Sequence, residues 1–168
     1  IWDWHIPTNY IIWSEEVAGL FGLGPGTFGG TYRAYANCVH SEDRSMLEEA
    51  IRRTLENDEP YEVEHRVVWP SGEVRWLACK GQVVKDQEGR PQRMLGTVQD
   101  ISIRKQAEIK LRDSQMFLTS IIENLPHMIF VKDAKDLRFV LFNKAGEELI
   151  DHERTALLGK TDYDFFPT

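Results

Sequence analysis

The sequence predicts an α+β fold, in which a five-stranded antiparallel sheet carries helices on one face. Five runs of β-forming residues are expected, most of them joined by short turns. The helical runs lie together between the second and the third of these β runs. The run from Gly96 to Glu108 then passes from strand-forming Thr97 and Val98 into Lys, Arg, Gln, Glu and Ala, which favour helix. A strand that continues directly into a helix transmits changes in the sheet. This joint favours a signalling module over an enzyme.

The first elements are predicted to be a hairpin and two helices. Apolar and polar residues alternate in IWDWHI, and the run at 10–13 pairs back across the turn at 7–9. Ser14 is expected to cap a short helix. Ser41 is expected to cap a longer one, whose apolar residues repeat at helical spacing. Glycines and a proline between residues 22 and 30 interrupt regular structure.

Three strands follow the longer helix, at 61–69, 73–85 and 92–101. Pro-Ser-Gly and Glu-Gly sequences mark the turns between them. We expect the first and last strands of this domain to lie side by side at the centre of the sheet.

The helix predicted from Ser102 to about Asn124 carries a heptad repeat. It either packs on its own domain or forms a short parallel dimer, and we favour the dimer. Arg104 and Ser114 stand at seam positions where an apolar residue would pack better. These polar residues leave the register or the twist of the two paired helices adjustable. The predicted seam consists of Ala107, Leu111, Leu118, Ile121 and Leu125.

After Pro126, the pattern of the first domain begins again. HMIFVKD and LRFVLFN read as strands, and Asn143 is expected to cap the helix KAGEELI. The three later strands have no counterpart. The strand HMIFVKD is therefore expected to leave an apolar edge open to another chain.

Composition excludes several classes of partner. A net charge of −7 argues against nucleic acid, because phosphate binding requires clustered Lys and Arg. No apolar stretch approaches the ~20 residues of a membrane span, so we expect no direct membrane contact in this segment. Cys38 and Cys79 form no metal motif, and a reducing compartment suits them. We expect a cytoplasmic protein, or the cytoplasmic part of a membrane-anchored receptor.

The chain resembles the PAS superfamily of sensory domains. The first copy matches through WDW…WSEEVAGLFG, VHSEDR, EVEHRVVWPSGEVRWL and GTVQDISIRKQAE, and the second through ENLPHMIFVKDA…FNKAGEEL…GKTDYDFFP. Asp100-Ile101-Ser102 stands where many members have Asp-Ile-Thr, and Ser41 stands where Pro is usual. The resemblance implies a PAS/PAC domain at 1–103, a signalling linker helix at 104–123 and the N-terminal half of a second PAS domain at 124–168.

The resemblance also implies how such a module works. PAS domains bind a small molecule or a partner between sheet and helices, and pass the change through the last strand into a coiled coil. We therefore expect a homodimer that relays through Asp100, Ile101 and Ser102 to an output domain of the same polypeptide, such as a histidine kinase or a diguanylate cyclase. The sequence contains no phosphoacceptor His, ATP-binding or cyclase motif, so we expect no catalytic residues. The alternative is a ligand-free dimerisation or spacer module.

The resemblance also implies which side chains face the space beneath the helices. Flavin-binding members have a pocket-facing Gln two residues before the strand-ending Asp, and Val98 holds that position here. Successive residues of a strand alternate faces, so the other inward residues follow from Val98 and from the same spacing on the neighbouring strands. A pocket and a plain apolar core both fit them. In the same way Trp76, Thr97, Gln99 and Ile101 are expected on the outer face. The pocket candidates are Val63, His65, Val67, Leu77, Cys79, Met94, Gly96 and Val98.

The common cofactors of the family fit this sequence poorly, and the ligand is left unidentified. Val98 replaces the Gln of flavin-binding members, and the residues after Cys38 differ from those that follow their photoactive Cys. Haem needs an axial His opposite the sheet, and the helix at 42–57 has none. His40 is expected to be a capping or loop residue. No metal site is predicted.

Overall fold

The computed structural model describes residues 1–165, which form two compact units divided between residues 107 and 108. Each unit has its own buried apolar core. The division falls inside the long helix that the sequence assigns to a linker. The three-part division with boundaries at 103 and 123 stays a prediction.

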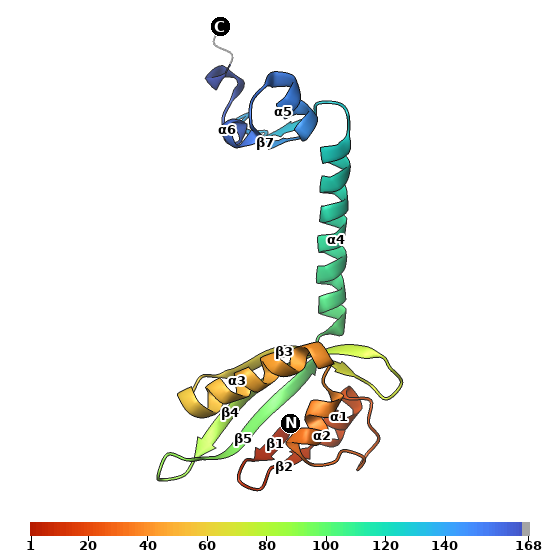
Figure 1. Ribbon diagram of the computed structural model, residues 1–168, viewed down its shortest axis with the longest axis vertical. Helices are drawn as coiled ribbons and strands as arrows, with labels where there is room; N and C mark the ends of the chain where they lie inside the picture. The colour runs from red at the N-terminus through yellow and green to blue at the C-terminus, as the bar shows by residue number, and fades with distance from the viewer. Residues whose placement is uncertain (166–168) are drawn as a thin grey trace. The chain divides into compact units, whose positions relative to one another are not determined.

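The first unit is built on a five-stranded antiparallel sheet with the order β2-β1-β5-β4-β3. β1 and β5 are adjacent at its centre, so the predicted strand order is confirmed (Figure 1). The strands are β1 (Trp2–His5), β2 (Tyr10–Trp13), β3 (Tyr61–Val68), β4 (Val74–Lys85) and β5 (Pro91–Asp100).

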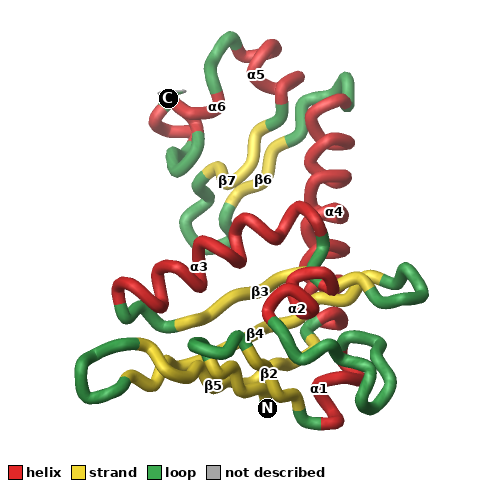
Figure 2. Tube along the Cα trace, turned by 60° about the horizontal axis from the view of Figure 1, so that its bottom comes forward, coloured by secondary structure: helices red, strands yellow, loops and turns green. Residues whose placement is uncertain are grey.

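Helices cover one face of this sheet, as the sequence predicts (Figures 1 and 2). They are α1 (Glu15–Leu20), α2 (Tyr32–Cys38) and α3 (Arg44–Asn57). Leu47 and Ile51 of α3 belong to the same buried cluster as Val63 and Cys79 of the sheet. Their burial fixes which side of each strand faces inward.

Of the two predicted helix caps, one is at the expected position and one is wrong. Ser14 is the N-cap residue of α1, although its hydroxyl accepts no hydrogen bond from a backbone N–H of that helix. Ser41 opens a 3-10 turn (Ser41–Asp43), and α3 begins only at Arg44. The ring of His40 caps that turn by accepting from the Glu42 N–H at 3.4 Å, in agreement with the capping role expected for it.

Helix α2 has no counterpart among the predicted elements, since it follows directly after the glycines that interrupt regular structure at 22–30. The Thr31 hydroxyl caps it by accepting from the Ala34 N–H at 3.2 Å. Thr31, placed directly after the last glycine, is the signal that would have located this helix.

The long helix α4 (Ser102–Asn124) matches the predicted range. The second unit repeats the predicted β-β-α order, and its core is formed by Phe139, Phe142 and Leu157. Residues 166–168 of the closing run lie outside the described residues. The elements after α4 are β6 (Phe130–Lys132), β7 (Phe139–Phe142), α5 (Lys144–Ile150), α6 (Arg154–Leu157) and a 3-10 turn (Asp162–Asp164).

Candidate ligand cavity and strand-to-helix joint

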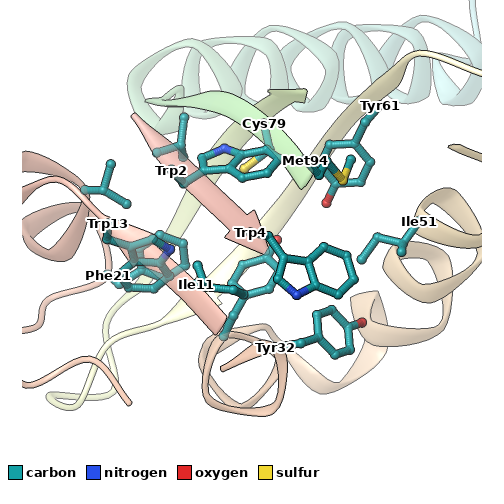
Figure 3. A pocket seen from close by; sticks show the side chains of 13 residues that line it. Trp2, Trp4, Ile11, Trp13, Phe21, Tyr32, Ile51, Tyr61, Cys79 and Met94 are labelled. Carbon is teal, nitrogen blue, oxygen red and sulfur yellow. The ribbon is translucent and has the colours of Figure 1, made fainter. Parts of the chain in front are cut away.

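A cavity of about 40 Å³ lies between the sheet and the helices of the first unit (Figure 3). Its wall is dominated by aromatic rings, which come from β1, β2, β3, α2 and the end of α1. The aromatic residues are Trp2, Trp4, Trp13, Phe21, Tyr32, Tyr35 and Tyr61. The others are Ile11, Val17, Ile51, Cys79, Met94 and Val98.

The pairing of β1 with β2 places several of these rings on the same face of the sheet. Trp2 pairs with Trp13, and Trp4 pairs with Ile11, so all four side chains point to the inner face. The Trp13 ring stacks on Phe21, with centroids 4.3 Å apart. The alternation in IWDWHI was the signal that two tryptophans share the inner face.

The eight pocket candidates divide into three groups. Cys79, Met94 and Val98 line the cavity. Gly96 is covered by the Trp2 ring, since a Cβ on it would lie 2.2 Å from that ring. The structure buries the remaining four in the core, away from the cavity wall: Val63, His65, Val67 and Leu77. That any of the eight binds a ligand stays a prediction.

His65 is fully buried, and its Nε2 lies 3.1 Å from the Tyr35 hydroxyl. Burial lowers the pKa of His65 to about 4, so its ring is neutral at pH 7. Burial also raises the pKa of Tyr35, and it raises the pKa of the Cys79 thiol to about 12. All three groups are therefore uncharged at pH 7, and Cys79 is a poor nucleophile.

The joint between β5 and α4 is closed by a short chain of hydrogen bonds. Asp100 Oδ1 accepts from the Ser102 N–H at 2.7 Å, and its Oδ2 lies 3.5 Å from Nη1 of Arg75. Ser102 Oγ in turn accepts from the Trp76 N–H at 2.9 Å. Asp100 thus contacts both a backbone N–H and an arginine. The first residue of α4 is fastened to β4.

Ile101, which was expected on the outer face of the sheet, is buried, and β5 ends one residue before it, at Asp100. Its N–H donates to the Trp76 carbonyl at 2.9 Å. Lys105 of α4 lies over the Trp76 ring, 5.2 Å from its centroid, and forms an ion pair with Glu64 at 2.6 Å. The first turn of α4 is therefore held against β3 and β4.

The five residues of the predicted dimer seam are exposed in the single chain. The exposed fraction is 62% for Leu111, 55% for Leu118, 42% for Ile121 and 38% for Leu125, and Ala107 is exposed as well. Apolar side chains repeated at this spacing fit a partner helix. The dimer stays a prediction.

Two polar residues of the second unit form hydrogen bonds to the last turn of α4. Asn143, fully buried, donates from Nδ2 to the Ile122 carbonyl at 2.9 Å, and its Oδ1 accepts from the Ile129 N–H at 2.8 Å. Arg154 forms two hydrogen bonds to Glu123, at 2.6 and 2.8 Å, and lowers the pKa of that carboxyl. The last turn of α4 therefore belongs to the second unit.

Residues 1–165 contain no cluster of three or more His, Cys, Asp or Glu side chains suited to a metal ion. In the same range, no helix combines the length and the apolar character needed to cross a membrane.

Two family models, both described as PAS fold, match residues 10–98 and 122–168. The chain is 27% identical over 159 residues to the sensor protein FixL of Bradyrhizobium diazoefficiens, covering 95% of this chain and 31% of that protein. It is 23% identical to the probable diguanylate cyclase DgcE of Escherichia coli K12, covering 95% of this chain and 14% of that protein. The chain thus spans less than a third of either relative.

A solved structure shares the fold. It is a sensory box histidine kinase/response regulator from Burkholderia thailandensis, with 31% identity and a TM-score of 0.63. The match covers 70% of this chain and 87% of that one.

Proposed function

The chain belongs to the PAS family, and from this premise we propose that its first domain is a sensor that relays the occupancy of its cavity into α4. One observation carries the proposal. β5 contributes Met94 and Val98 to the cavity wall and, two residues after Val98, ends at Asp100, whose carboxylate binds the first N–H of α4. A displacement of β5 at the cavity therefore acts on the start of the helix.

The relay needs a link between the sheet and the helix that resists bending. The hydrogen bonds of Asp100 and Ser102, together with the Glu64–Lys105 ion pair over Trp76, supply several contacts within one turn. Because these contacts hold the first turn of α4 to the sheet, a displacement of the sheet moves the whole helix and does not unwind that turn. We assign Asp100, Ile101 and Ser102 to this role.

The receiving end of the relay is a homodimer formed by α4. The exposed seam supports it, since each large apolar side chain that a partner buries stabilises the dimer by roughly 1.5–3 kcal/mol. The parent protein carries an output domain, of the kinase or cyclase type named for the relatives, and works in the cytoplasm or on the cytoplasmic side of a membrane receptor. Nucleic acid is not a partner.

Light scattering of Leu111→Glu and Leu118→Glu variants tests the dimer. We expect the wild type to be dimeric and both variants monomeric, because each introduces a charge into the seam. Met116→Glu is the matched control. Met116 is 63% exposed on the same helix and lies away from the seam, so this variant should remain dimeric. A monomeric wild type, or dimeric seam variants, would contradict the proposal.

The second candidate, a ligand-free spacer, is favoured by the small volume of the cavity. Native mass spectrometry of the protein purified from its own host distinguishes the two. A small molecule of constant mass that is released on unfolding supports the sensor. Its consistent absence, with no response of the cavity to added small molecules, supports the spacer.

A further inference from the structure

The lining of the cavity restricts the charge of whatever occupies it. All thirteen side chains that form the wall are uncharged, and the groups able to ionise are three tyrosines and one cysteine. Burial raises the pKa of Tyr32, Tyr35, Tyr61 and Cys79, which keeps these groups neutral at pH 7. A carboxylate, phosphate or ammonium group placed here would lose its hydration without gaining a partner of opposite charge.

One polar group in the wall lacks a partner. The indole Nε1 of Trp4 is buried and donates to no atom of residues 1–165. Two other indoles of this unit differ: Nε1 of Trp2 donates to the Thr97 carbonyl at 3.1 Å, and Nε1 of Trp69 donates to the Leu20 carbonyl at 3.0 Å. A buried N–H without an acceptor is costly, so a molecule that supplies one gains the hydrogen bond.

The surroundings of Trp4 hold its indole in place. The ring stacks on Tyr32 with centroids 5.6 Å apart, and its backbone pairs with Met94 on β5. Figure 3 shows the Trp4 ring between these two side chains. Trp4 itself therefore lies on the strand next to β5, which continues into α4.

The size of the cavity limits the molecule further. A water molecule needs about 10–15 Å³ of such space, so 40 Å³ admits about three or four non-hydrogen atoms. An aromatic ligand would have to displace one of the wall rings, because a cavity that binds benzene measures about 150 Å³.

We propose that this cavity binds a small uncharged molecule of about three or four non-hydrogen atoms, whose oxygen or nitrogen accepts a hydrogen bond from Nε1 of Trp4. The inference rests on the proposed sensor function and names the chemical class of its ligand. Trp4 is then the residue that selects for an acceptor, and the neutral wall selects against charge.

Acetone and acetate test the proposal, because they are nearly isosteric and differ in charge. Each is titrated into the full ¹⁵N-labelled chain while the indole N–H resonances are followed by NMR. We expect acetone to shift the Trp4 indole resonance saturably, and acetate to leave it unchanged at tenfold higher concentration. The resonance of Trp76, whose ring lies on the outer face, should not respond.

Trp4→Phe keeps an aromatic ring against Tyr32 and removes the donor. Followed through the Met94 and Cys79 amides, it should weaken acetone binding at least fivefold. Trp69→Phe, outside the cavity, should change it less than twofold. If Trp4→Phe does not fold, the wild-type shift of the Trp4 N–H carries the test.

Two results would overturn the inference, and they are distinguishable. Equal binding of acetone and acetate, or unchanged binding by Trp4→Phe, would mean that the ligand class is wrong while the sensor function stands. If neither probe moves any cavity resonance and the native protein carries no small molecule, the ligand-sensing function fails together with the inference.

Discussion

At the scale of single residues, the buried polar groups of the first domain have the clearest consequences. His65 and Trp4 each bury a nitrogen that has no partner within residues 1–165, Nδ1 in the first and Nε1 in the second. For His65 the result is a ring that resists protonation inside the fold. That resistance links stability to pH.

We predict that His65 destabilises the domain as the pH falls from 6.5 to 4. In this range the unfolded chain binds a proton at its ordinary pKa of about 6.5, whereas the folded ring, with a pKa of about 4, stays neutral. The free energy of unfolding should fall by roughly 1.4 kcal/mol per pH unit, or about 3 kcal/mol in all. Urea unfolding at a series of pH values measures this loss.

His65→Gln is the matched variant, because an amide can keep the hydrogen bond to Tyr35 and does not titrate. Its stability should be flatter over the same range. Titration of Asp43 does not affect the comparison of wild type and His65→Gln. A hydrogen bond from Arg66 lowers the pKa of Asp43, so the stability that this carboxylate contributes is lost below its ordinary pKa of 3.8. Parallel pH curves for wild type and variant would contradict the assignment.

Sequence reasoning at this scale succeeded for faces and failed for one cap. The resemblance supplied one inward position, at Val98, and strand alternation then placed Leu77, Cys79 and Met94 inward correctly. The cap expected at Ser41 is wrong because a 3-10 turn at Ser41–Asp43 precedes α3, which begins at Arg44. Residue type alone does not show where such a turn passes into an α-helix.

At the scale of elements, the passage from β5 to α4 was the best-predicted feature. A switch in residue type from strand formers to helix formers is local information, and the observed helix begins at the predicted residue. Helix α2 was missed because its only strong signal, Thr31, follows a stretch rich in glycine. The cavity was missed in part because its aromatic wall comes from five elements that meet only in the folded domain.

We predict that Ser102→Ala loosens the joint. The Ser102 hydroxyl accepts from the Trp76 N–H, so its removal leaves a backbone donor of β4 without that partner and should cost about 1–2 kcal/mol. Hydrogen exchange at the Trp76 amide should accelerate, and urea unfolding should report the loss. Ser45→Ala, at an exposed position of α3, is the control and should leave both unchanged. An unaltered Trp76 amide in Ser102→Ala would count against the assigned role of this bond.

At the scale of the whole molecule, the two units differ in how much structure supports them. The first unit has a five-stranded sheet and two buried clusters, whereas the sheet of the second, within the described residues, has two strands. Phe130 and Val131 of β6 are 44% and 47% exposed, which agrees with the apolar edge expected there. A two-stranded sheet is only marginally stable by itself.

We predict that the second unit opens first. Hydrogen exchange should show β6 and β7 exchanging well before β4 and β5, and the difference should shrink when a partner chain or further strands cover β6. A chain extended by three further strands should protect Phe130 and Val131 without any partner. Equal protection of both sheets in a dilute monomer would refute this prediction.

Because α4 is one continuous helix, its length sets the rotation of whatever domain follows it about the helix axis. One inserted residue turns everything that follows by about 100° around the helix axis, whereas seven residues bring it back to within about 20° of the original direction. Gene fusions that exchange the domain after α4 should therefore succeed when the joined helices differ in length by about one heptad, and fail at intermediate lengths. The domain that follows α4 can therefore be exchanged only when the helix length changes by a multiple of about seven residues.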